Sequence, residues 1–155
     1  MGDQPWVLSK IDTSKITDDE RKEYGVGTLA EQREKVKLMN KKNLSELLAN
    51  GNTVDEVVTF CLQEDKSKSL YNLSESGVNN FGYGLMAQKR YREALKIFEL
   101  NIKLYPKGSN AFDSYGECLF KLGKKEEAIA AYKKSLELNP KNSNAHKVLA
   151  EIKGK

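Results

Sequence analysis

Residues 75–108 read ESGVNNFGYGLMAQKRYREALKIFELNIKLYPKG, and residues 109–142 read SNAFDSYGECLFKLGKKEEAIAAYKKSLELNPKN. The two stretches align at a constant offset of 34 residues, while the polar residues between the matches differ. The matched pairs are Phe81 and Tyr115, Gly82 and Gly116, Leu85 and Leu119, Ala94 and Ala128, Phe98 and Tyr132, Leu104 and Leu138, and Pro106 and Pro140. Self-similarity at one fixed period indicates a repeat architecture.

Each repeat predicts two helices joined by a tight turn. In the second repeat, Tyr115 and Leu119 belong to one apolar stripe at helical spacing, and Gly123 then interrupts the pattern. A second stripe starts at Ala128 and closes before Pro140, whose ring cannot continue a helix. The unit is therefore a helical hairpin.

Small residues mark the place where the two helices of a hairpin cross. Gly82 and Gly116 occupy the same repeat position, and Phe98 and Tyr132 occupy another. We expect each aromatic ring to fill the space beside the small residue of its own hairpin, because a glycine lets a neighbouring helix approach closely.

This spacing of large, small and aromatic residues resembles the tetratricopeptide repeat (TPR) family, whose period is about 34 residues. Two full copies cover residues 75–142, and SNAHKVLAEIKGK at 143–155 resembles the single capping helix of such arrays. The resemblance implies an all-α fold, a TPR-like helical-hairpin solenoid of two full repeats and a C-terminal capping helix, preceded by additional helices.

The sequence departs from the family pattern at several positions. Val78 and Phe112 stand where Trp is usual, Lys89 stands where the turn Gly is usual, and Asn101 stands where Ala is usual. We expect Asn101 to weaken the first repeat most, since it brings a polar amide to a close helix crossing.

Capping boxes predict further helices upstream. Thr53 with Glu56 opens a helix over 54–65, which we expect to pack on the first helix of the 75–108 repeat and close that end of the array. Similar starts are Thr17 with Glu20, Thr28 with Glu31, and Asn43 with Glu46. The predicted organisation is an irregular or partly disordered segment 1–27, accessory helices with a degenerate repeat at 28–74, two repeats at 75–142 and a capping helix at 143–155.

Composition narrows the class of protein. The 155 residues are 39% hydrophobic and 31% charged, which suits a thin helical array better than a thick α/β core. No stretch approaches the roughly 20 apolar residues of a membrane span, and the first residues do not read as a signal peptide. These observations predict a cytoplasmic protein without a membrane partner.

Reactive groups are sparse. Cys61, Cys118 and His146 are too few for a Cys/His metal site, and no S-x-x-K, K-T-G or G-x-S-x-G motif places a nucleophilic serine. The G-x-G-x-x-A patterns that begin at Gly25 and Gly82 lack the preceding strand that a dinucleotide site requires. We expect no enzyme activity, no catalytic residue, no cofactor and no metal.

The resemblance implies a protein-protein interaction module that binds a peptide or a partner surface on the concave face lined by the first helix of each repeat. The partner-binding candidates on that face are Asn79, Tyr83, Met86, Asp113, Glu117, Lys121, Lys147 and Glu151. The family's two-carboxylate clamp needs Lys and Asn, whereas Asp113 and Glu117 would repel a peptide carboxylate terminus. The alternative is a merely hydrated face on a spacer or a dimer contact.

Two other functions remain open. The region from about 54 to 146 also resembles the TPR tail behind some bacterial serine hydrolases of the β-lactamase-like and esterase types, which implies an accessory tail and a homodimer. Nucleic acid could instead bind the basic segment 21–42, where Arg33, Lys37 and Lys41 recur at helical spacing, but no aromatic residue is interleaved there for base stacking. Nucleic acid is therefore the least favoured partner.

Overall fold

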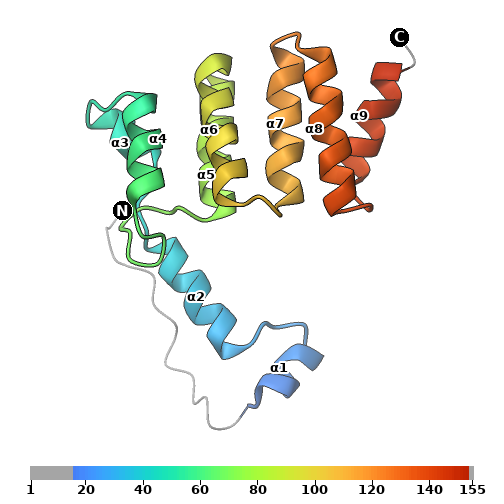
Figure 1. The fold of residues 1–155 in the computed structure, drawn as a ribbon. Helices are drawn as coiled ribbons and strands as arrows, with labels where there is room; N and C mark the ends of the chain where they lie inside the picture. The colour runs from blue at the N-terminus through green and yellow to red at the C-terminus, as the bar shows by residue number, and fades with distance from the viewer. Residues whose placement is uncertain (1–15, 154–155) are drawn as a thin grey trace. The chain divides into compact units, whose positions relative to one another are not determined.

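The computed structural model describes residues 16–153, with the side chain of Lys153 left out, and these residues form helices and no β-strand (Figure 1). The chain divides into two compact units, residues 1–42 and 43–155. The helices of the described range are α1 (Asp18–Glu23), α2 (Leu29–Met39), α3 (Ser45–Ala49), α4 (Val54–Gln63), α5 (Glu75–Ala87), α6 (Tyr91–Leu104), α7 (Ser109–Lys121), α8 (Lys125–Leu138) and α9 (Ser143–Lys153). The predicted all-α fold is confirmed.

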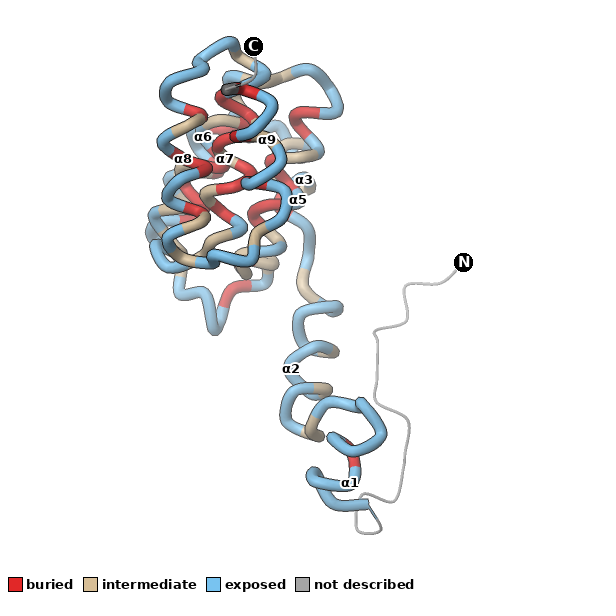
Figure 2. Tube along the Cα trace, turned by 90° about the vertical axis from the view of Figure 1, so that its right-hand side faces the viewer, coloured by how far each residue is buried: buried red, intermediate tan, exposed pale blue. Residues whose placement is uncertain are grey.

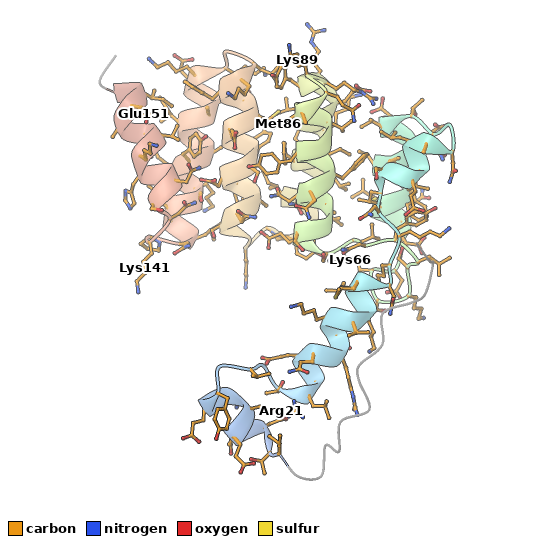
Figure 3. All side chains as sticks on the ribbon, turned by 180° about the vertical axis from the view of Figure 1, so that it is seen from behind. Arg21, Lys66, Met86, Lys89, Lys141 and Glu151 are labelled. Atoms are coloured by element: carbon orange, nitrogen blue, oxygen red, sulfur yellow. The ribbon has the colours of Figure 1, made fainter. Side chains whose placement is uncertain are left out.

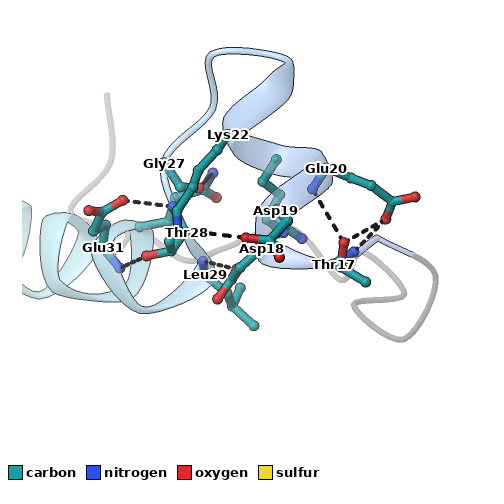
Figure 4. A network of polar contacts seen from close by, with 11 residues as sticks. Thr17, Asp18, Asp19, Glu20, Lys22, Gly27, Thr28, Leu29 and Glu31 are labelled. Atoms are coloured by element: carbon teal, nitrogen blue, oxygen red, sulfur yellow. Dashed lines mark hydrogen bonds and ion pairs between the residues drawn. The ribbon is translucent and has the colours of Figure 1, made fainter.

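The described part of the first unit holds α1 and α2, each opened by a predicted capping box. The backbone N–H of Thr28 donates to the Glu31 carboxylate at 2.7 Å, and the N–H of Glu31 donates back to the Thr28 hydroxyl at 3.2 Å (Figure 4). The Leu29 N–H also donates to the Asp18 carboxylate at 2.9 Å, which joins the start of α2 to α1. The rest of the predicted irregular segment, residues 1–15, lies outside the described residues.

The second unit is a row of antiparallel helices in which α5 pairs with α6 and α7 with α8, as the repeat predicts (Figure 1). Buried residues lie along the inner sides of these hairpins, and Phe98 and Tyr132 are among the largest fully buried side chains (Figure 2). A Cβ on Gly82 would lie 2.6 Å from the Phe98 ring, and one on Gly116 would lie 3.3 Å from the Tyr132 ring. The predicted glycine crossings are therefore confirmed, with the tighter one in the first repeat.

The helix predicted over 54–65 is present as α4. We expected it to pack on α5, the first helix of the 75–108 repeat, but it packs chiefly on α6. An ion pair of 2.6 Å between Asp55 and Lys96 marks this contact. The connection over residues 64–74 is longer than the connections over 105–108 and 139–142. The longer connection allows α4 to depart from the regular spacing of the array.

The predicted capping box at Asn43 is only half formed. The Asn43 N–H donates to the Glu46 carboxylate at 2.9 Å, but α3 begins after Leu44 without a side-chain cap. Helix α3 spans only Ser45–Ala49, whereas α5 spans Glu75–Ala87. The first hairpin of the second unit, α3 and α4, is therefore shortened in its first helix.

Candidate peptide-binding face

Helices α5, α7 and α9 occupy the first-helix position of successive repeats, and their exposed side forms the first-helix face. Helix α5 supplies Asn79, Tyr83 and Met86, helix α7 supplies Asp113, Glu117 and Lys121, and helix α9 supplies Lys147 and Glu151. Figure 3 shows Met86 on α5 and Glu151 on α9. The structure gives these residues different environments.

Tyr83 and Glu117 are brought together across α5 and α7. The Tyr83 hydroxyl donates to the Glu117 carboxylate at 2.9 Å and lies 3.2 Å from the Ser114 hydroxyl. The Tyr83 ring also packs edge-to-face on Phe98, with ring centroids 5.4 Å apart. Burial, reinforced by the Glu117 charge, raises the pKa of Tyr83 to about 12, so the hydroxyl keeps its proton and remains a donor.

The Asp113 carboxylate is hydrogen-bonded to other side chains of the protein. Asp113 is only 8% exposed, and its two carboxylate oxygens accept hydrogen bonds from the side-chain amides of Asn142 at 3.0 Å and Asn144 at 2.9 Å. These bonds fix the α8–α9 connection and the start of α9 to helix α7. The carboxylate has little surface left for a ligand.

Asn79 and Met86 are also buried, and Met86 belongs to the hydrophobic core of α4, α5 and α6. The Asn79 amide oxygen lies 3.5 Å from the Asn101 side-chain nitrogen, at the limit of a hydrogen bond. Both side chains therefore contribute mainly to packing between helices.

The remaining candidates are accessible. Lys121, Lys147 and Glu151 are exposed, and Glu117 is half-buried. No ion pair links these four residues within the described part of the chain. The accessible part of the first-helix face is therefore a mixed-charge surface around the fixed Tyr83 and Glu117 pair.

Phe120 is a surface residue that the sequence reasoning missed. It lies on α7 beside Lys121 and is 43% exposed, although it is a large aromatic residue. Phe120 follows Met86 by the repeat offset of 34, so the alignment of the two repeats could have identified it as a candidate for the same face. Exposed aromatic residues are common anchors in protein interfaces.

A groove of about 360 Å³ lies between α3 and α5. Its walls include Leu48 of α3 and Phe81, Gly84 and Gln88 of α5. A Cβ built on Gly84 would meet no atom within 4 Å, so this glycine faces open space. The groove is present because the short α3 covers only part of α5.

Neither cysteine is poised as a nucleophile. Cys61 and Cys118 are free and buried, and burial raises the pKa of their thiols to about 12 and about 11. The Cys118 thiol donates to the Tyr91 carbonyl oxygen at 3.3 Å. Within residues 16–153 no group of three or more His, Cys, Asp or Glu side chains could hold a metal ion.

The basic segment 21–42 contains the end of α1, where Arg21 is buried, and the whole of the exposed helix α2. Helix α2 has no buried residue, and its Lys37 forms an ion pair with Glu34. No helix in the described part of the chain is long and apolar enough to cross a membrane. A nucleic-acid role for this segment stays a prediction.

Comparisons with known proteins agree with the repeat assignment. The family model described as "Tetratricopeptide repeat" matches residues 116–142. A solved structure, the first TPR of Spaghetti (RPAP3) bound to the HSP90 peptide SRMEEVD, is similar over 76% of this chain and 90% of its own, with 22% sequence identity and a TM-score of 0.53. No curated protein matches the sequence.

These matches show the fold, and they do not show a likeness to the tails of serine hydrolases. The segment matched by the family model covers the end of α7 and the whole of α8. Residues 116–142 match the tetratricopeptide repeat model, and the chain shares the helical-hairpin fold of tetratricopeptide repeat domains.

Proposed function

We propose that this chain is a non-catalytic interaction module that binds a peptide segment of a partner protein on the first-helix face. The observation that carries the proposal is the hydrogen bond of 2.9 Å between Tyr83 and Glu117. It holds an aromatic ring and a carboxylate in fixed positions on neighbouring helices before any ligand arrives. Groups fixed in advance lose less conformational entropy when a ligand binds.

The chemistry of this surface favours a particular kind of peptide. Glu117 can accept hydrogen bonds from peptide N–H groups or attract a cationic side chain, and the exposed ring of Phe120 offers an apolar contact. Asp113 is not counted as a ligand-binding group, because Asn142 and Asn144 occupy both of its oxygens. The structurally similar TPR domain of Spaghetti is bound to a peptide, which supports a peptide ligand here.

The test is a selection of peptides from a displayed library on the whole chain, followed by calorimetry with the selected peptides. The variants Glu117→Gln and Phe120→Ala should each weaken binding by about tenfold, the loss typical of an interface anchor. Glu137→Gln is the matched control, because Glu137 is exposed on α8 and its ion pair among residues 16–153 is with Lys134.

Unchanged affinity in both face variants would reject the first-helix face as the binding site. Size-exclusion chromatography with light scattering tests whether the first-helix face instead mediates dimerisation of the chain. A dimer that Phe120→Ala dissociates in the absence of peptide would assign this face to self-association instead.

A further inference from the structure

Cationic side chains gather at the end of the hairpins where α5 turns into α6 and α7 turns into α8. The two turns are neighbours, because Leu122 of the second turn lines the same hollow as residues 89–93 of the first, and this hollow measures about 330 Å³. The hydrogen bond from Cys118 to the Tyr91 carbonyl joins α7 to the start of α6 at this end. The hollow is therefore shared by both repeats.

Two of the cations here are already paired. Arg90 forms an ion pair with Glu93 at 2.6 Å, and Lys124 forms the equivalent pair with Glu127 at 3.0 Å, one repeat further along. The turns and the helix ends beside them also hold four exposed cations for which the described residues offer no acidic partner within 4 Å. These four residues, called here the turn-end cations, are Lys89, Arg92, Lys121 and Lys125.

Lys89 has an unusual backbone conformation. Its φ is 60°, and it is the one non-glycine residue with positive φ in the described chain. The same repeat position in the second hairpin is Gly123, with φ 77°. A side chain in the left-handed region costs conformational energy, and such costs persist most often where a residue serves a function. Figure 3 shows Lys89 at the turn end, with its side chain directed away from the helices.

We propose that the turn-end cations and the hollow between them bind an acidic peptide segment of a partner protein. This is a second surface, separate from the first-helix face except for Lys121, which belongs to both. The planar guanidinium of Arg92 can bind a carboxylate through two hydrogen bonds, and the lysines act as point charges around it. Leu122 and Tyr91 give the hollow an apolar wall for a side chain between the acidic residues.

Acidic residues interspersed among the cations favour a peptide over a nucleic acid. Glu93 lies in the first turn of α6, and Glu126 and Glu127 lie in the first turn of α8, so a continuous phosphate backbone would meet their charges as well as those of the cations. An acidic peptide carries separate carboxylates on flexible side chains. It can place these carboxylates at the cations and turn its uncharged residues toward the glutamates.

The test is a binding titration of the whole chain with a fluorescein-labelled peptide of ten glutamates, measured by anisotropy at low salt. The variant Lys89→Gly/Arg92→Gln/Lys125→Gln should raise the Kd by about tenfold, as expected when most of an electrostatic contact is removed. The control Lys107→Gln/Lys133→Gln/Lys141→Gln removes the same amount of charge from exposed lysines elsewhere, and Figure 3 shows Lys141 at the opposite end from Lys89. The control should keep the Kd of the unaltered chain.

Each other outcome overturns the proposal. Equal weakening by both triple variants would mean that only net charge matters, and no saturable binding by the unaltered chain would mean that the surface takes no acidic peptide. A labelled DNA duplex of matched charge that binds more tightly, and is lost in the turn-end variant, would assign the surface to nucleic acid. Tyr83, Glu117 and Phe120 are unaltered throughout, so failure here is distinguishable from failure of the first-helix face.

Discussion

The side-chain nitrogen of Asn101 lies 3.1 Å from the carbonyl oxygen of Glu75, across the crossing of α6 and α5. One repeat further along, the Ser135 hydroxyl donates to the carbonyl of Ser109 at 2.8 Å. Both hairpins therefore use a polar side chain at the position where the family has Ala, and that side chain reaches the first residue of the facing helix. The Asn101 nitrogen is therefore hydrogen-bonded, while its oxygen has no hydrogen-bond partner among the described residues, and the expected weakening of the first repeat stays a prediction.

Replacing Asn101 by Asp keeps the shape of the side chain but removes the donor and buries a carboxyl group. We expect the free energy of unfolding to fall by about 3 kcal/mol at neutral pH, the cost of an unpaired buried polar group. Because burial would raise the pKa of the new carboxyl group, the loss should be smaller in acid, where the group is protonated. Urea denaturation at two pH values measures this difference, and a loss independent of pH would contradict the explanation.

Gly82 and Gly84 form a matched pair on α5. Gly82→Ala should destabilise the protein by about 1 to 3 kcal/mol, because the new methyl group would overlap the Phe98 ring. Gly84→Ala should stabilise it by up to about 1 kcal/mol, because alanine favours the helix and its methyl group would enter open space. Thermal denaturation of the two variants checks the signs, and a shift of the same sign in both would show that local packing does not decide the effect.

Lys89→Gly should raise the free energy of unfolding by about 0.5 to 1 kcal/mol, because glycine adopts positive φ without a steric cost. The reciprocal change Gly123→Lys should lower it by a similar amount, since it places a side chain at φ 77°. Chemical denaturation measures both changes. If Lys89→Gly instead lowers the free energy of unfolding, the contacts of the lysine side chain stabilise the fold by more than its positive φ destabilises it.

Alkaline pH should destabilise the protein through its two buried thiols. Burial raises the pKa of Cys61 from 9.0 to about 12 and that of Cys118 from 9.0 to about 11. Above pH 9 the unfolded chain releases these protons while the folded chain keeps them, so each thiol lowers the free energy of unfolding by roughly 1 kcal/mol per pH unit until its folded pKa is reached. Well below pH 9, where both states keep their thiol protons, neither thiol contributes to the pH dependence.

The measurement is denaturant unfolding between pH 8 and 10.5 for the unaltered chain and for Cys61→Ala/Cys118→Ala. The double variant starts from a lower stability because it loses buried volume, so the comparison concerns the slope with pH. A shallower slope in the variant is expected. An equal slope would assign the alkaline loss to other groups, among which Tyr83 also has a pKa raised to about 12.

The sequence predicts the hairpins because their determinants are local and occur twice. Gly82 beside Phe98 and Gly116 beside Tyr132 are visible as an offset of 34 residues, and each capping box needs only two residues three positions apart. The predicted packing of α4 on α5 is wrong, because the position of α4 depends on the long connection over residues 64–74. No repeat or helical period in the sequence determines the course of that connection.

The candidate site was less predictable, because a position on a helix face does not reveal whether a neighbour already uses the side chain. Asp113 and Glu117 are equivalent in the sequence pattern, yet both Asp113 oxygens accept hydrogen bonds from residues later in the chain, Asn142 in the α8–α9 connection and Asn144 in α9. Phe120 could have been found by applying the repeat offset to Met86. The groove beside Gly84 could not have been predicted in this way, because it depends on the length of α3, which spans only Ser45–Ala49.

That short α3 also bears on how the array could be lengthened. A repeat array grows by adding hairpins whose helices match those already present. On α5, the side facing α3 carries Gly84 beside unfilled space, so a full-length first helix grafted in place of α3 has room to dock. Chimeras that exchange residues 43–63 for a complete hairpin would then extend the solenoid from its amino-terminal end without redesign of the two repeats behind it.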